Sequence, residues 1–131
     1  MSQEDFEIVR RSFDAWNELD IDAIRRCYTE DALIGTAIIE LGRTLGGDDP
    51  IGHWVAETRE TWAEVHWDIE RLFEGCGVVL SFYRATGIGR QSGVEVVQEL
   101  AGVYRIRDGL IASERVYLDR EDAVEAAGLR E

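Results

Sequence analysis

The sequence predicts a single α+β domain in which N-terminal helices cover one face of a curved antiparallel sheet. Two observations carry this prediction. Up to about residue 62, apolar residues recur at steps of three and four, which is typical of helices with one buried face. From residue 65 onward, apolar and polar residues alternate between short turns rich in glycine, which is typical of antiparallel strands. Helices followed by a meander of strands define the α+β class.

Capping residues mark the helices of the N-terminal half. Asp20 can cap a second helix, because its side chain accepts a hydrogen bond from a free backbone N–H. Pro50 suits the first turn of a third helix, with Asp48 or Asp49 as the cap. The expected elements are helices at residues 4–19, at 21–28 and from Pro50 onward, a short strand at 32–37 and a loop at 38–49.

Short turns separate the strands of the C-terminal half. They are expected at residues 75–77, 89–93 and 107–109. Asp119 can cap a final helix, which Gly128 ends. The expected elements are strands at residues 65–73, 78–88, 94–107 and 110–118, and a short helix at 119–127.

The charge of the chain excludes some classes of partner. The net charge is −13, whereas nucleic acids and anionic membranes bind basic surfaces. The N-terminus is acidic and lacks the apolar core of a signal peptide, and no segment is apolar enough to span a membrane. We therefore expect a cytoplasmic protein that binds neither nucleic acid nor membranes.

The cysteines and histidines do not form a metal-binding pattern. Cys27 and Cys76 are expected to be free thiols, because two isolated cysteines form no disulfide framework. His53 and His66 are the only histidines, so a histidine-based metal site is not expected. We expect neither a metal nor another cofactor.

Glu114 is out of place on the expected strand 110–118. Its side of the strand is otherwise apolar, with Leu110, Ala112, Val116 and Leu118. Three interpretations remain open. Glu114 pairs with Arg84, which lies on the more apolar side of strand 78–88; or burial raises its pKa and makes it an acid or base; or the alternation is assigned to the wrong face.

Aromatic residues are the other candidates. Tyr28 either packs in the core or donates a hydrogen bond in a pocket, and His53 is either exposed or a pocket acid or base. The tryptophans either fill the core or present rings to a planar apolar ligand. They are Trp16, Trp54, Trp62 and Trp67.

Five segments in this order resemble the SnoaL-like group of the nuclear transport factor 2-like superfamily. They are Ala15-Trp16-Asn17-Glu18-Leu19-Asp20-Ile21-Asp22-Ala23-Ile24, Tyr28-Thr29-Glu30-Asp31-Ala32, residues 89–93, Val103-Tyr104-Arg105-Ile106-Arg107-Asp108-Gly109-Leu110-Ile111 and Tyr117-Leu118-Asp119-Arg120-Glu121-Asp122-Ala123. The resemblance implies a cone-shaped sheet with a pocket at its open end. It does not imply one activity, because this fold carries enzymes of several classes and binding modules.

The catalytic residues of the characterised relatives are not kept. In the alignment with ketosteroid isomerases, the tyrosine of the first helix falls on Ser12, the general base on Thr36 and the late aspartate on Gly102. Only Tyr28 matches a supporting tyrosine of that site. The Asp–Arg–Asp set of limonene epoxide hydrolases has no counterpart on an expected strand.

The resemblance implies where a ligand would bind. Glu114, with Arg84 as its partner, is the candidate catalytic group. The implied ligand-binding residues are Trp16, Tyr28, His53, Trp54, Trp67, Tyr104 and Leu118. We expect a pocket for a small apolar or aromatic molecule, in a cofactor-independent cyclase, isomerase or dehydratase with Glu114 as acid or base. The alternative is a non-catalytic binding or dimeric accessory module. The outer face of strand 94–107, which mixes apolar and charged residues, predicts a homodimer.

Overall fold

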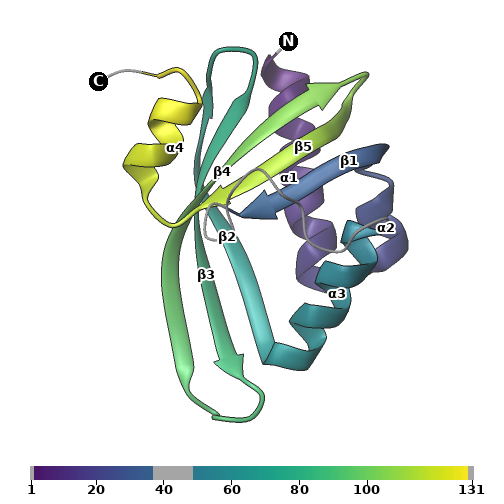
Figure 1. Ribbon diagram of the computed structural model, residues 1–131, viewed down its shortest axis with the longest axis vertical. Coiled ribbons are helices and arrows are strands. Elements are labelled where there is room, and N and C mark those ends of the chain that lie inside the picture. The colour runs from purple at the N-terminus through teal and green to yellow at the C-terminus, as the bar shows by residue number, and fades with distance from the viewer. Residues whose placement is uncertain (1, 37–48, 130–131) are drawn as a thin grey trace.

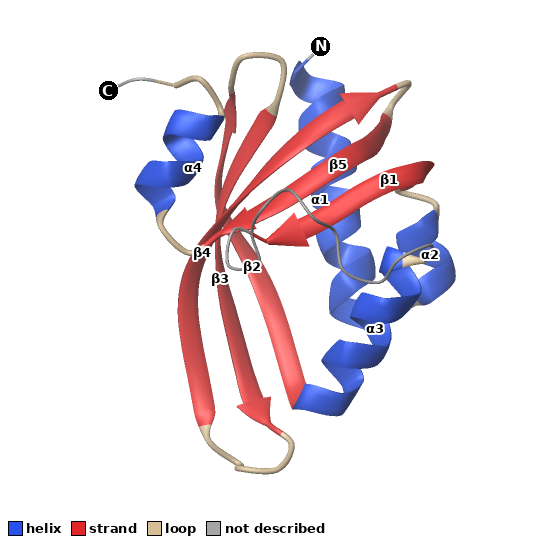
Figure 2. Cartoon of the chain, in the orientation of Figure 1, coloured by secondary structure: helices blue, strands red, loops and turns tan. Residues whose placement is uncertain are grey.

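The computed structural model describes residues 2–36 and 49–129, which form four helices and one five-stranded sheet (Figures 1 and 2). The elements are α1 (Ser2–Glu18), α2 (Ile21–Arg25), β1 (Tyr28–Thr36), α3 (Pro50–Thr61), β2 (Trp62–Glu74), β3 (Val79–Gly89), β4 (Glu95–Arg107), β5 (Leu110–Tyr117) and α4 (Arg120–Ala126). The predicted α+β class is confirmed. The loop expected at 38–49 lies outside the described residues, except for Asp49.

The sheet has the strand order β1-β5-β4-β3-β2. The four C-terminal strands are antiparallel neighbours, as expected, but β1 pairs in parallel with β5. This pairing begins directly after α2, where the Ile111 N–H donates to the Cys27 carbonyl. Tyr28 therefore opens β1, although the sequence predicted it at the end of the second helix.

Aspartate caps fix three helix starts as predicted. Asp20 accepts a hydrogen bond from the Ala23 N–H, and Asp119 accepts one from the Glu121 N–H. Asp49 caps α3 and also binds the Arg25 guanidinium through both carboxylate oxygens, at 3.0 and 3.1 Å. This pair joins the start of α3 to α2.

The helices cover both faces of the sheet, and each face has its own core. Figure 1 shows α1, α2 and α3 on one side and α4 on the other. The main core lies under the first three helices and includes Val79, Tyr83, Leu100 and Tyr104. The smaller core lies under α4 and includes Leu80, Ala101, Ala123 and Ala127. Neighbouring residues of β3 and β4 therefore pack on opposite faces.

Arg84 points to the α4 side of the sheet. Its side chain is 47% exposed and forms ion pairs with Glu70 at 3.3 Å and Glu99 at 3.4 Å. The prediction that Arg84 pairs with Glu114 is wrong. The error arises from the second core. Leu80 lies on the same side of β3 as Arg84 and packs under α4, so this side of the strand is apolar as well. The alternation of apolar and polar residues along β3 therefore did not identify the face that meets the first three helices.

Arg120 connects α4 to the sheet. Its guanidinium donates to the carbonyl oxygens of Leu100 at 3.2 Å and Tyr83 at 3.0 Å. It also pairs with Glu70 at 2.8 Å and lies over the Phe82 ring, 4.6 Å from its centroid. Removing this side chain would leave two strand carbonyls without their side-chain donor.

The Arg120→Ala substitution is therefore expected to lower the free energy of unfolding by about 2 kcal/mol. Arg84→Ala is the matched control, because it removes only exposed ion pairs and should cost less than about 1 kcal/mol. Urea denaturation of the two variants measures both values. Equal losses would show that the carbonyl contacts of Arg120 contribute nothing.

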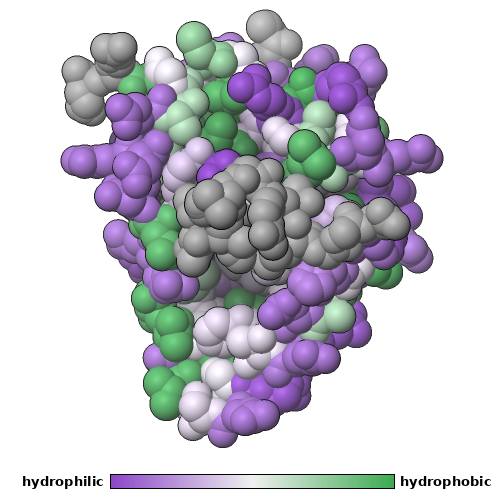
Figure 3. All heavy atoms as spheres, viewed as in Figure 1, coloured by the Kyte–Doolittle hydropathy of each residue, from purple (hydrophilic) through white to green (hydrophobic). Residues whose placement is uncertain are grey.

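Hydrophilic residues cover much of the face in Figure 3, but a hydrophobic group lies at the lower left, over the start of β4. Val94, Val96 and Val97 are the exposed apolar residues of that region. None of the helices in the described ranges is long and apolar enough to cross a membrane.

Candidate functional site

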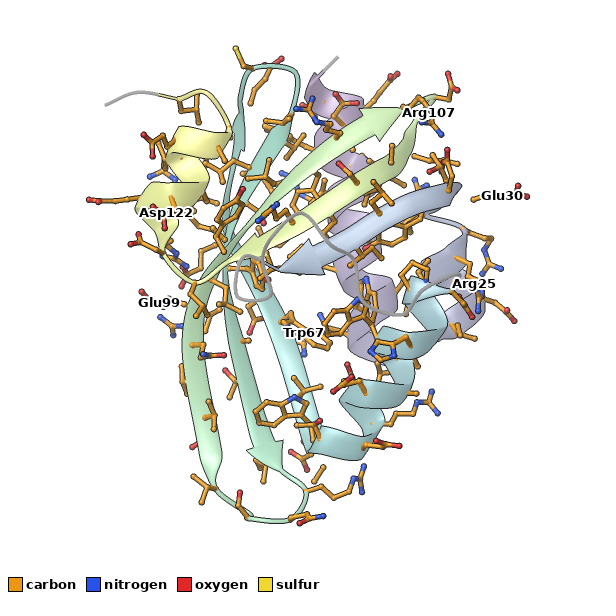
Figure 4. The ribbon with its side chains drawn as sticks, viewed as in Figure 1. Arg25, Glu30, Trp67, Glu99, Arg107 and Asp122 are labelled. Atoms are coloured by element: carbon orange, nitrogen blue, oxygen red, sulfur yellow. The ribbon has the colours of Figure 1, made fainter. Side chains whose placement is uncertain are left out.

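A cavity of about 140 Å³ lies between α1, α3 and the inner face of the sheet. Trp67 extends from β2 toward this space (Figure 4). Most of the lining is apolar or aromatic. The lining residues are Ser12, Phe13, Trp16, Ile34, Gly35, Trp54, Thr58, Trp67, Tyr83, Glu114 and Val116. A larger hollow of about 500 Å³ between α1 and β2 is lined by exposed charged groups such as Arg10 and Asp68, which makes it a weaker candidate.

Glu114 reaches the cavity from β5. It shares its face with Val116, as predicted, and its register neighbours are Ile34 on β1 and Tyr104 on β4. The Tyr28 hydroxyl donates to Glu114 Oε1 at 2.5 Å and accepts from Trp16 Nε1 at 2.9 Å. A chain of hydrogen bonds thus runs from α1 through β1 to the carboxyl on β5.

The surroundings of Glu114 favour its protonated form. Part of the side chain faces the cavity, but protein encloses the carboxyl closely enough to remove most of its water. Burial raises the pKa of Glu114 from 4.5 to about 7, and the hydrogen bond from Tyr28 opposes this rise. Near neutral pH the group is therefore present both as acid and as base.

Tyrosines rather than charged side chains surround this carboxyl. Burial raises the pKa values of Tyr28, Tyr83 and Tyr104, and the neighbouring Glu114 charge adds to the effect. These hydroxyls stay protonated at neutral pH. Within residues 2–36 and 49–129, only Tyr28 bonds to Glu114, and no Lys, Arg or His lines the cavity.

The structure brings together five of the nine residues that the sequence singled out. Trp16, Trp54, Trp67 and Glu114 line the cavity, and Tyr28 bonds to Glu114. Trp54 Nε1 is buried and has no hydrogen-bond partner among the residues that the structure describes. Whether these residues bind a ligand remains a prediction.

The other predicted residues lie elsewhere. Arg84 is exposed on the opposite face, as described above. His53 is exposed and pairs with Glu57 at 3.0 Å, because it lies on the outer side of α3. Leu118 is 50% exposed, because β5 ends at Tyr117 and the chain leaves the sheet there. These placements contradict the predicted pocket roles of the three residues.

Tyr104 is fully buried and does not line the cavity. Its hydroxyl bonds to Ser81 at 3.1 Å and lies over Gly102, where an added Cβ would come within 2.6 Å of it. The Tyr104 ring therefore fills the space beside Gly102, the residue that the sequence alignment matched to the late aspartate of the isomerases. Gly102 provides the room for this ring.

Sequence reasoning missed two aromatic lining residues, Phe13 and Tyr83. Phe13 lies one turn before Trp16 on the apolar stripe of α1, so helical spacing could have identified it. Tyr83 was missed because the faces of β3 were interchanged. In the described ranges no three His, Cys, Asp or Glu side chains are grouped to hold a metal ion, and Cys27 and Cys76 are free thiols, as expected.

Comparison with known proteins places the chain in a family. Residues 9–114 match the model of the SnoaL-like domain, so the chain belongs to the SnoaL-like family. No curated protein matches the sequence.

Solved structures share the fold at low sequence identity. A protein from Jannaschia sp. CCS1, named as a SnoaL-like polyketide cyclase, has a TM-score of 0.76 and 19% identity, with 98% of this chain and 94% of that chain covered. A hypothetical protein from Catenulispora acidiphila with a ketosteroid isomerase-like fold, in complex with trimethylamine, has a TM-score of 0.75 and 22% identity over 95% and 94% of the two chains. TerC, co-crystallised with polyporic acid, has a TM-score of 0.75 and 16% identity over 93% and 98%.

Proposed function

We propose that the cavity binds a small, largely apolar molecule and that Glu114 transfers a proton to or from it, as in a cofactor-independent cyclase, isomerase or dehydratase. One observation carries this proposal: a carboxyl with a pKa of about 7 lies in the lining of an otherwise apolar pocket. A general acid or base works best when its pKa is near the working pH. Perturbed carboxyls in clefts are candidates for this role.

The size of the cavity limits the substrate. A cavity of about 150 Å³ in another protein holds a benzene molecule, and the volume of this one is about 140 Å³. A single ring or a branched group of that size would therefore fill it. The Tyr28–Trp16 chain supports the role of Glu114, because it holds the carboxyl in one orientation toward the cavity.

The alternative is a binding module without catalysis. It is favoured by the two positions that align with catalytic residues of the isomerases: the Ser12 hydroxyl donates to the Val9 carbonyl, and the Tyr104 ring occupies the space at Gly102. Two structural neighbours carry small molecules, trimethylamine and polyporic acid, which supports ligand binding in both versions.

A proton-exchange experiment distinguishes catalysis by Glu114 from ligand binding without catalysis. Small cyclic ketones are incubated with the protein in heavy water, and NMR follows exchange of the protons next to the carbonyl. The Glu114→Gln variant is expected to exchange about 100-fold more slowly than the wild type. Glu95→Gln, which removes an exposed carboxylate on β4, serves as the control for charge. Equal exchange rates for wild type and Glu114→Gln would refute Glu114 as the base, and bound ligand without exchange would establish the binding module.

We also propose that a second copy of the chain covers the outer sheet face near the start of β4. The 56% exposure of Val97 on that face supports this, since apolar surface left exposed can mark an interaction site. Sedimentation equilibrium tests it directly, and a monomer at all concentrations would refute it.

A further inference from the structure

Aromatic side chains from four elements surround the cavity. They are Phe13 and Trp16 of α1, Trp54 of α3, Trp67 of β2 and Tyr83 of β3. Phe13 and Tyr83 meet edge to face with centroids 5.1 Å apart, and Trp16 and Trp67 do so at 6.3 Å. In such a pair the edge of one ring covers one face of the other ring, so each ring keeps at least one face that its partner does not cover. These five residues form what we call the aromatic cage.

The charges around the cage all favour a cation. The π-face of an aromatic ring is negative and attracts cations. Among the described residues that line the cavity, Glu114 is the only acidic or basic side chain. An anionic ligand would meet no positive side chain among these described lining residues, and the net charge of −13 would repel it.

We propose that the ligand of this pocket carries a small organic ammonium group, which the aromatic cage holds by cation–π contacts and Glu114 by an ion pair. The inference rests on the proposed function in that it names the ligand class of the same pocket. It does not require that Glu114 transfers a proton. The volume of about 140 Å³ suits an ammonium group with a few methyl or methylene substituents.

The ionisation of Glu114 is coupled to such a ligand. Among the described residues, the titratable groups that face it are Tyr28 of β1, Tyr83 of β3 and Tyr104 of β4, all of which stay neutral near pH 7. Without ligand, burial keeps much of the carboxyl protonated. A cation beside it favours the carboxylate. Binding therefore releases a proton near neutral pH, and the affinity for the cation should rise as the pH rises through about 7.

A pair of isosteres tests the charge preference. Choline carries a trimethylammonium group, and dimethylbutanol is its neutral counterpart with carbon in place of nitrogen. Tryptophan fluorescence follows both titrations, because three tryptophans line the cavity. At about pH 8 the wild type is expected to bind choline at least about tenfold more tightly than dimethylbutanol. At about pH 6 this preference should shrink, because protonated Glu114 offers no charge.

Two substitutions at Trp54 isolate the contribution of the ring. Its Nε1 has no partner in the described part of the chain, so replacing it removes no hydrogen bond of the side chain that the structure describes. Trp54→Leu should lower the choline preference several-fold, whereas Trp54→Phe, which keeps a π-face, should retain most of it. Glu114→Gln should lower the affinity for choline about tenfold without lowering the affinity for dimethylbutanol. The exposed control Glu95→Gln should change neither affinity.

The binding titrations test the ligand class, whereas the ketone-exchange experiment tests catalysis, so the two proposals can fail separately. Equal affinity for choline and dimethylbutanol, or no choline binding at millimolar concentrations, overturns the ammonium inference. The ammonium inference is also overturned if the Trp54→Leu variant prefers choline over dimethylbutanol as strongly as the wild type does. If choline is preferred but ketone exchange fails, the proposed catalysis falls and the ligand class stands. If exchange depends on Glu114 but the isosteres bind equally, the catalysis stands and the ligand class falls.

Discussion

The free energy of unfolding should fall by about 3 kcal/mol relative to that of the Glu114→Gln variant as the pH rises from about 4 to about 8. Glu114 has a pKa of about 7 in the folded protein, against an ordinary value of 4.5. Below about pH 4.5 both states carry the proton, so the folded state has no disadvantage. Between the two values the unfolded chain releases its proton while the folded protein keeps it, so stability decreases. Above about pH 7 the loss is complete.

The variant is a close reference for this effect. Its amide oxygen can still accept the hydrogen bond from Tyr28, but the side chain does not titrate. Other groups, such as Asp31 and Asp49, whose pKa values are lowered by arginine partners, contribute equally to both proteins and cancel in the difference. Urea denaturation at a series of pH values gives the curve. A constant difference between the two proteins across this range would contradict a raised pKa at Glu114.

Removing the Tyr28 hydroxyl should move the titration of Glu114 further upward. This hydroxyl bonds to Glu114 at 2.5 Å, and the bond lowers the pKa of the carboxyl against the effect of burial. In the Tyr28→Phe variant we expect the pKa to rise by about one pH unit or more above its wild-type value, since a hydrogen bond to a charged group contributes about 1.5–3 kcal/mol. Trp16 Nε1 also loses its acceptor, so the protein should be less stable by about 1–3 kcal/mol.

Carbon NMR of labelled glutamate carboxyls follows this titration directly. Tyr83→Phe is the matched control, because it removes a nearby tyrosine hydroxyl that is not bonded to Glu114. The control should leave the midpoint near its wild-type value. If both variants move the midpoint equally, general polarity rather than the short Tyr28 bond sets the pKa.

The elements of this fold could be predicted largely from local chemistry. Asp20, Asp49 and Asp119 cap the helices that the sequence assigned to them, because capping depends on a few neighbouring residues. The end of α2 and the parallel pairing of β1 could not be predicted. They depend on a contact between Cys27 and Ile111, which lie far apart in the sequence.

The site could be predicted only in part, because some of its residues stand out locally whereas others depend on contacts between distant parts of the sequence. Glu114 stood out because a single carboxylate interrupts an apolar alternation, and one strand is enough to show this. Its partner could not be identified, because alternation shows that a strand has two faces but not which helix covers each. The second core under α4 made the Arg84 face of β3 look internal, and the true partner, Tyr28, belongs to a strand that joins the sheet from the other end of the chain.

The parallel pairing of β1 with β5 also has a consequence for the order of folding. Tyr28 and Glu114 are 86 positions apart, and among the described strands β1 has only β5 as a neighbour in the sheet. Contacts between such distant residues carry a large loop-closure entropy and form slowly. The hairpins β2–β3, β3–β4 and β4–β5 can form first, each between neighbours in the chain. The last edge of the sheet and the polar chain beside the cavity would then be completed together, so a partly folded protein without docked β1 would contain no assembled site.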